Sequence, residues 1–571
     1  MLMILLRSTL FALVAAVSLT AQDLSPEDKA CLACHGQKGM SKKSASGEVV
    51  ELHVDKAKFG ASIHASLGCT GCHSDLAGSA HPSKTPVQPV SCEGCHADAV
   101  KTFNSSAHAA AHRAGRFAPT CADCHTKHEI LGSMDSASPV SRKNLGKTCG
   151  TCHEEVVKDV LESTHGQAMA RGVKEAPTCL DCHSDHQLEA LKGAATLKIA
   201  EQVCSRCHAS QRMNSKLHIA GNRVSTFFES YHGMAAKLGS PTAANCASCH
   251  GFHKILPSSD PKSSVHPANL VHTCQKCHPG ANEKFTAGRI HSEGTEVATL
   301  GDRINSWVKR AYIGMILLVV GGMAAHNLFA LWRKARYAYR DPERTVVRMN
   351  LLARIQHGLL ATSFIYLVLT GFALKYPDSW LGDIFGASEA WRRIGHRSAA
   401  VIMIALSFFH VFFVFFTRDG RKFVRDMWPE KKDLFDVFVN LRHFHDSKKP
   451  RPDFRRFGYA EKAEYWALVW GTIIMGATGL MLWAKMWVTH WLPRWMVDVA
   501  TTIHLYEAIL ATLAIIVWHF YFVIFDPDVY PLNWAWFDGR VNREHYREEH
   551  PLDTPEEVAY NDKAHPETEE D

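Results

Sequence analysis

Eighteen cysteines fall into nine Cys-x-x-Cys-His segments, all before residue 300, and no cysteine is left over. This spacing is the attachment signature of c-type haem, in which two thiols bond to the porphyrin and the adjacent His reaches the iron. Neither a zinc site nor a disulfide would place a His after every pair. The predicted thioether residues are Cys31, Cys34, Cys69, Cys72, Cys92, Cys95, Cys121, Cys124, Cys149, Cys152, Cys179, Cys182, Cys204, Cys207, Cys246, Cys249, Cys274 and Cys277. The predicted proximal iron ligands are His35, His73, His96, His125, His153, His183, His208, His250 and His278.

Nine haems would leave roughly thirty residues for each, too few for an ordinary hydrophobic core. We therefore expect the haems themselves to form the core, with the chain wrapped around them as short helices and irregular segments. The predicted fold class is mostly α and irregular: a haem-packed multihaem cytochrome c domain followed by an all-α bundle of five transmembrane helices.

Two patterns recur around these segments and supply further histidines. One is Ser-x-His upstream, as in SSAH, and the other is a His three residues after the segment, as in CADCHTKH. A haem that only carries electrons needs a second axial ligand, and methionines are few here, so we expect bis-His ligation and low potentials. The sequence does not assign each His to an iron. The predicted distal ligands are His64, His108, His165, His232 and His291 from the first pattern, His128, His186 and His253 from the second, and His81 by analogy.

The N-terminus has one early Arg, an apolar run and then small residues, which is typical of a secretory signal; an uncleaved anchor helix is the alternative. Every other long apolar run follows residue 300. The predicted divisions are a signal peptide at 1–21, a periplasmic nine-haem domain at 22–300, a linking transmembrane helix and cytoplasmic loop at 301–349, a four-helix di-haem cytochrome b domain at 350–530, and a cytoplasmic tail at 531–571.

Five apolar segments are long enough to cross a bilayer, at approximately 311–332, 351–374, 397–417, 463–484 and 500–525. The loops after the first and third are rich in Lys and Arg, which predicts that these loops are cytoplasmic. The Cys-rich domain then lies in the periplasm, the C-terminus in the cytoplasm, and the bundle in a bacterial inner membrane. No basic tract with interleaved aromatics indicates a nucleic-acid partner.

Histidines within membrane helices are costly and are candidates for function. His504 and His519 are fifteen residues apart, or roughly 22 Å along a helix. We expect His396 to pair with His504 near the outer side and His357 with His519 near the cytoplasmic side, because two His pairs at two depths can hold two b-type haems. His410 is an alternative to His357. His326 is assigned to packing or to a quinone pocket.

Residues 350–525 resemble the cytochrome b subunit of formate dehydrogenases and nickel-iron hydrogenases, on the stretches RIQHGLLATSFIYLVLTGFALKYP, WRRIGHRSAA, YAEKAEYWALVWGTIIMGATGLMLW and TTIHLYEAILATLAIIVWHFYF. By this resemblance, His357, His396, His504 and His519 fall on haem-ligand positions, although the step between the last two is one residue longer than expected. The resemblance also implies a quinone beside the cytoplasmic haem, where Glu461, Lys462, Glu464 and Tyr465 are candidates. An ordinary charged helix entrance is the alternative for these four.

The whole architecture is similar to the Cbc-type inner-membrane cytochromes of metal-respiring bacteria. The resemblance implies a menaquinol oxidoreductase of anaerobic respiration, of the quinol:cytochrome c type, with no residue assigned to catalysis. Its partners would be the quinone pool and periplasmic c-type cytochromes. The cofactors would be nine covalent haem c, two removable haem b and menaquinone. Two alternatives remain open: a multihaem terminal reductase of a nitrogen or sulfur oxyanion, and a tethered electron conduit without its own quinone site.

Overall fold

A computed structural model describes residues 24–43, 47, 49–77, 87–190, 199–219, 221–287, 291, 299–334, 344–385, 388–446 and 448–553. The predicted signal peptide and His81 lie outside these residues. Within them the chain is mostly helical, with two small antiparallel sheets of two strands each, so the predicted mostly-α fold is confirmed. The chain divides into two compact units, 1–213 with 246–266, and 214–245 with 267–571.

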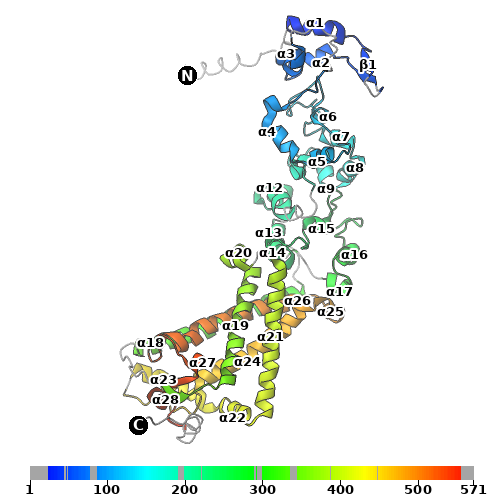
Figure 1. Cartoon of the computed structure of the whole chain (residues 1–571). Coiled ribbons are helices and arrows are strands. Elements are labelled where there is room, and N and C mark those ends of the chain that lie inside the picture. Colours follow the sequence, from blue (N-terminus) through cyan, green and yellow to red (C-terminus); the bar gives the residue numbers. More distant parts are fainter. Residues whose placement is uncertain are drawn as a thin grey trace, which may run out of the picture. The chain divides into compact units, whose positions relative to one another are not determined.

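The first unit contains short helices joined by irregular segments (Figure 1). Its elements are α1 (Pro26–His35), β1 (Ser41–Lys43), β2 (Val49–Glu51), α2 (Lys56–Gly60), η1 (Ala65–Leu67), α3 (Gly68–Cys72), η2 (Ser74–Leu76), α4 (Glu93–Asn104), α5 (Ala107–Arg113), α6 (Cys121–His125), α7 (Leu145–Gly150), α8 (Glu154–Glu162), α9 (Thr164–Ala170), α10 (Cys179–His183), η4 (Ile199–Cys204), α11 (Ser205–His208) and α15 (Cys246–His250), with α12 (Gln211–Leu217) crossing into the second unit. Its hydrophobic cluster is small and centres on Leu24, Leu32 and Phe59.

Helix caps explain why the Ser-x-His pattern recurs. Ser106 and Ser163 accept hydrogen bonds from the backbone N–H groups of Ala109 and Gly166, at 3.1 Å each, and so begin α5 and α9. These caps satisfy N–H groups that the first helical turn leaves unpaired. The His two residues later therefore lies at a fixed place in the first turn of its helix. The repeated serine is a positioning device for the repeated His.

The second unit contains the long helices. Its elements are α13 (Arg223–Glu229), α14 (Tyr231–Lys237), η5 (Pro267–Asn269), α16 (Leu270–Gln275), α17 (Glu283–Thr286), α18 (Leu300–Lys334), β3 (Arg344–Val347), α19 (Leu351–Lys375), α20 (Trp380–Phe385), α21 (Glu389–Phe416), α22 (Arg418–Asp426), α23 (Lys431–His445), α24 (Tyr459–Trp483), α25 (Lys485–Trp491), α26 (Trp495–Ala514), η6 (Ile515–His519), η7 (Tyr521–Phe525), α27 (Ala535–Asp538), β4 (Arg540–Asn542) and α28 (Arg543–Glu549).

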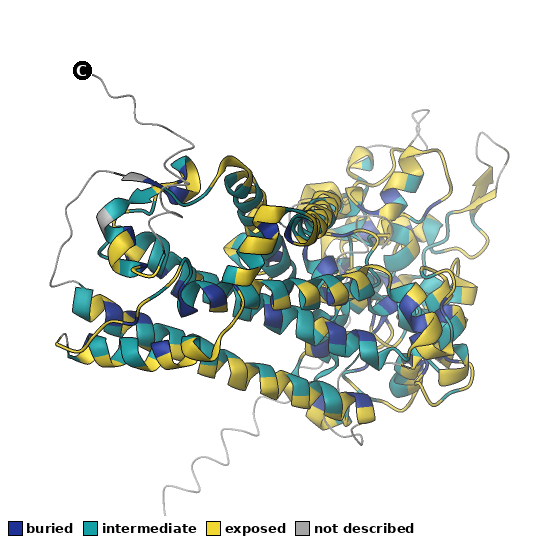
Figure 2. Ribbon diagram, turned by 90° about the horizontal axis from the view of Figure 1, so that it is seen from below, coloured by how far each residue is buried: buried dark blue, intermediate teal, exposed yellow. Residues whose placement is uncertain are grey.

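Five helices in this unit are long and apolar enough to cross a membrane: α18, α19, α21, α24, and α26 continued through η7. Many residues along these helices are coloured as exposed in Figure 2, and the exposed residues include large apolar ones. Leu318 is 76% exposed and Phe408 is 72% exposed. Such extensive apolar surface is stable only against lipid or another apolar partner. The protein is therefore an integral membrane protein, and the predicted five spans are confirmed.

The chain after the last span is folded up to residue 553. β4 pairs with β3 in antiparallel register, and Tyr546 packs on the buried Val346. Lys334, the last residue of α18, forms ion pairs with Asp526 at 2.7 Å and Asp528 at 2.6 Å. These contacts with β3 and α18 stabilise the segment that follows the last span.

Candidate haem sites

Two helix hairpins in the bundle carry the same Thr-Gly and His pattern. Thr370 on α19 contacts His396 on α21 (Oγ1 to Nδ1, 2.8 Å), and Thr478 on α24 contacts His504 on α26 (2.9 Å). The sequence separation is 26 residues in both hairpins. His396 and His504 also lie within electrostatic range of each other. We call this the α25 end of the bundle.

The hydrogen-bond network assigns the protons on these two rings. Each Thr hydroxyl donates to a carbonyl of its own helix, Thr370 to Tyr366 at 2.6 Å and Thr478 to Ile474 at 2.7 Å. The hydroxyl oxygen must then accept from the imidazole, so Nδ1 carries the proton in both histidines. The Nε2 lone pairs remain free, which is the state required for binding iron, and the Thr contacts are the outer partners that orient such ligands.

Glycines leave room for the same two rings. A side chain at Gly479 would place its Cβ 3.3 Å from Cε1 of His504, and one at Gly371 would place it 3.7 Å from Cε1 of His396. The first distance is tighter than ordinary van der Waals contact and the second is not. The twin Thr-Gly dipeptides therefore combine a hydrogen-bond acceptor with space for the ring.

The opposite end of the bundle, which we call the α23 end, brings together His357 on α19 and His519 in η6. Their ring centroids are 6.1 Å apart. His519 Nδ1 donates to Glu464 Oε1 at 2.7 Å, so its Nε2 is free as well. His357 Nδ1 is buried without a hydrogen-bond partner. The structure thus pairs His519 with His357 rather than with His410.

A π turn accounts for the extra residue between His504 and His519. Ile515–His519 is π-helical, and such a turn takes up one more residue than an α-helical turn. The fifteen-residue step from His504 to His519 therefore covers about the same length of helix as the fourteen-residue step from His396 to His410. Asn327 on α18 donates to the Val517 carbonyl within this turn at 2.6 Å. Sequence reasoning missed Asn327, because its role depends on packing between helices.

The predicted quinone residues do not form one cluster. Glu461 pairs with Arg348, and Lys462 pairs with Asp433 at 3.0 Å, so both stabilise the helix entrance. Glu464 is bonded to His519, as described above.

The two remaining residues bond to other rings. His326 contacts the Tyr459 hydroxyl at 2.7 Å. Tyr465 lies 3.1 Å from Nε2 of His410, whose Nδ1 lies 3.4 Å from Gln356. A ring engaged in this way at Nε2 is not poised to bind iron.

Among the described residues, the His of seven Cys-x-x-Cys-His segments faces a predicted distal His. Two rings that each place a nitrogen about 2 Å from a metal between them have centroids about 6 Å apart, so the observed distances fit an iron between each pair. The pairs are His64 with His96 (5.9 Å), His73 with His128 (6.4 Å), His108 with His153 (6.2 Å), His125 with His186 (6.2 Å), His165 with His208 (6.1 Å), His183 with His253 (6.1 Å) and His232 with His278 (6.0 Å).

These pairs follow a rule that the sequence did not show. Each Ser-x-His residue faces the His of a segment without a trailing His, as His108 faces His153. Each trailing His faces a segment earlier in the chain, as His186 faces His125. His35 Nδ1 bonds to the Leu52 carbonyl at 2.9 Å, and His291 Nδ1 lies 3.3 Å from the Thr226 hydroxyl; neither contact uses Nε2 of the ring.

The first cysteines of successive segments come together in the first unit. Thiol contacts join Cys31 with Cys69, Cys92 with Cys121, Cys149 with Cys179 and Cys204 with Cys246. Haems attached to these adjacent thiols would be anchored next to each other. The eight segments are therefore arranged as four close pairs.

The ninth segment belongs to the second unit and packs on the α25 end of the bundle. Lys284 donates to the carbonyls of His490 and Trp491, at 3.3 Å each, and α14 contacts α19. Burial, together with the nearby charge of Lys485, lowers the pKa of His232 to about 4. The His232 ring is therefore neutral at pH 7, as an iron ligand must be.

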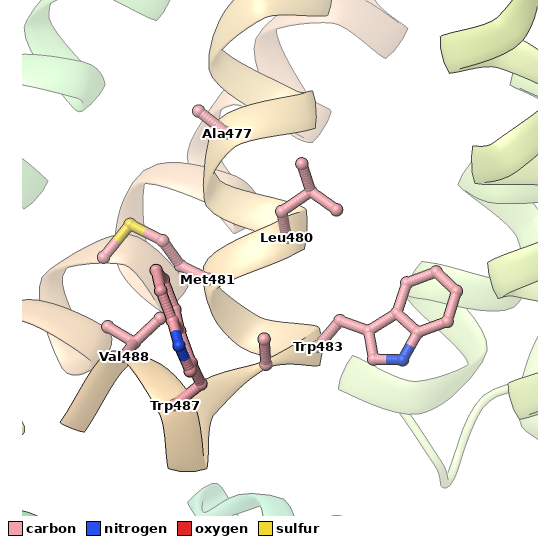
Figure 3. Close-up of a pocket in the computed structure, with 7 residues that line it drawn as sticks. Ala477, Leu480, Met481, Trp483, Trp487 and Val488 are labelled. Atoms are coloured by element: carbon pink, nitrogen blue, oxygen red, sulfur yellow. The ribbon is translucent and has the colours of Figure 1, made fainter. Parts of the chain in front are cut away.

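An apolar hollow of about 400 Å³ lies beside α24 and α25 (Figure 3), lined by Ala477, Leu480, Met481, Trp483, Trp487 and Val488. Apart from two indole nitrogens, these side chains offer no polar atom. The hollow can accept an apolar group but has no means of orienting a reactive one.

A membrane-spanning bundle with facing histidines at two depths has the architecture of a b-type cytochrome, a class that carries electrons on non-covalent haem. Residues 348–531 match the family model described as prokaryotic cytochrome b561. A comparison with curated proteins found no match. The matched segment contains α19, α21, α24 and α26 and excludes α18. The membrane part of the chain is thus a cytochrome b domain for electron transfer.

Proposed function

We propose that the protein oxidises menaquinol in the bacterial inner membrane and passes the electrons to nine periplasmic c-type haems. From there they would reach periplasmic cytochromes or extracellular acceptors in anaerobic respiration. The haems, when bound, supply one-electron oxidation and reduction. The chain supplies their ligands, spacing and surroundings.

One observation carries this proposal: the ninth Cys-x-x-Cys-His segment lies in the same compact unit as the b-type bundle and rests on its α25 end. His232 and His278 face each other there, and His396 and His504 lie at the same end of the bundle. A quinol oxidase with no outward path would not need this contact. The five spans and the basic loops support a topology with the first unit in the periplasm and residue 553 in the cytoplasm.

For the quinone we propose a place at the α23 end, beside His410 and Tyr465. Gln356, which contacts His410, precedes His357, and Tyr465 follows Glu464, the partner of His519. Phe423 packs edge-on against both His410 (5.9 Å) and Tyr465 (5.4 Å). Aromatic walls with one imidazole and one phenol suit a flat ring that exchanges protons.

The test is reduction of the purified full-length protein by a menaquinol analogue under anaerobic conditions. Absorbance of the c haems should rise after that of the b haems, and solvent extraction should remove two haems per chain and leave nine. Reduction of b haem with c haem left oxidised would refute the proposal.

A matched pair of variants sharpens the quinone assignment. Tyr465→Phe should slow reduction by quinol, whereas Tyr459→Phe, a change of the same kind on the same helix, should not. Both should keep two removable haems. Equal rates in the two variants would place the quinone elsewhere.

A further inference from the structure

Four cationic side chains gather at the α25 end, between the His396–His504 site and the His232–His278 site. Arg392 and Arg397 lie within electrostatic range of His396. Lys485 and Arg494 lie within range of both His232 and His278. The two groups are themselves linked, because Arg397 and Arg494 both act on Lys485.

Arg392 is the least satisfied of these cations. It is 5% exposed, and its Nε and Nη2 atoms are buried without hydrogen-bond partners. A guanidinium stays charged at any physiological pH, and a buried charge without a partner is strongly unfavourable. Its titratable neighbours are Glu389 and Tyr231, of which only Glu389 is an anion at pH 7, and Ser240 donates a hydrogen bond to Glu389.

Lys485 shows the same excess of positive charge. Its ammonium lies 4.9 Å above the Tyr231 ring. Burial, followed by the charges of Arg494 and Arg397, lowers the pKa of Lys485. Of the acidic groups at this end, Asp498 pairs with Arg494 at 3.8 Å. The cluster therefore fits additional anions, at positions between two histidine pairs.

We propose that Arg392 and Lys485 bind the propionate carboxylates of the haems held at the His396–His504 and His232–His278 sites. This inference rests on the proposed function. Each haem carries two such carboxylates, and bidentate contact with a carboxylate would satisfy Nε and Nη2 of Arg392 together. The cationic cluster is then the point at which electrons leave the membrane domain.

The test is a redox titration with chemical mediators on the full-length protein, which needs no quinol. Arg392→Gln removes a positive charge next to one b haem and should make its reduction about tenfold less favourable, a shift of about 59 mV for one electron. Arg393→Gln is the matched control, because its side chain is adjacent in sequence but exposed. Arg392→Lys should restore most of the shift.

Lys485→Gln is a second, independent variant, and it should lower the potentials of one b haem and one c haem together. Haem content and propionate vibrations in resonance Raman spectra are measured on every variant. Equal potentials in Arg392→Gln and Arg393→Gln would overturn the inference. So would a phospholipid that is bound one per chain and lost only in Arg392→Gln, with propionate vibrations unchanged. Wild-type protein without removable haem would instead refute the proposed function.

Discussion

The two ends of the membrane bundle hold their histidines by different means. At the α25 end, two hairpins related by the same 26-residue step each use a threonine to fix Nδ1. At the α23 end, His519 is fixed by a carboxylate and His357 has no partner at Nδ1. A repeated hairpin thus gives a symmetric site at one end and an asymmetric one at the other.

The asymmetry follows from single residues. The position in α24 that corresponds to His357, thirteen residues before the Thr of the hairpin, is Tyr465. That Tyr bonds to His410, so the second His pair that full symmetry would create is absent among the described residues. Under the proposed function, the symmetric end only carries electrons, whereas His410 and Tyr465 at the other end exchange protons with the quinone.

Replacing the histidines should have the largest effect on the two sites. His504→Ala and His519→Ala should each lower the removable haem from two to one per chain, because a bis-His site cannot hold iron firmly through one ring. His410→Ala should retain two. Haem extraction and visible spectra measure this, and loss of one haem in His410→Ala would show that His410, not His357, is the ligand.

Removing the outer partners should have smaller effects that differ between the ends. Thr478→Val and Thr370→Val should each weaken haem binding at the α25 end by about 10–100-fold, with Thr478→Ser as the matched control. Glu464→Gln should raise the potential of the haem at the α23 end, because a carboxylate partner makes the imidazole a more basic ligand. Haem titration of the depleted protein and redox titration distinguish these results. Identical effects of the two Thr variants on both haems would contradict separate sites.

Asn327→Leu should affect the α23 end alone. It leaves the Val517 carbonyl in the π turn without its donor, at a cost of about 1–3 kcal/mol. The thermal unfolding temperature should fall by a few degrees, and the visible spectrum of one b haem should change. Asn440→Leu, which removes a donor to Tyr459 but not to the π turn, provides the control. A change in both haems would indicate general destabilisation.

The smallest difference should distinguish the two glycines at the α25 end. Gly479→Ala places a methyl 3.3 Å from the His504 ring and should weaken haem binding a few-fold, whereas Gly371→Ala, at 3.7 Å, should be almost neutral. Haem retention on dilution measures this. Equal retention would show that the ring at His504 shifts freely.

Local patterns in the sequence allowed much of this fold to be predicted. The five spans follow from apolar length, and the observed helix boundaries lie within a few residues of the expected ones at most ends. The exceptions are α18 and α21, which begin at Leu300 and Glu389, well before the expected starts. The positions of His357, His396, His504 and His519 follow from helical spacing. The facing of His108 with His153 could not be predicted, because it depends on how separate segments pack.

Other features depend on contacts between elements that are distant in the sequence. The π turn before His519 is stabilised by Asn327, 190 residues earlier. The charges of Glu461 and Lys462 suggested a reactive site, but their partners Arg348 and Asp433 come from other elements. Residue type predicts the chemistry that a side chain can perform, and packing decides whether that chemistry is already in use.

Helix α18 lies outside the segment that matches a cytochrome b family, yet its Asn327 donates to the π turn that contains His519, a proposed haem ligand. Residues 348–531 alone, moved into another protein, would lack Asn327. They would also lack Lys334, which forms an ion pair with Asp526. Helix α18, which precedes the matched segment, thus also stabilises the last helix of the bundle.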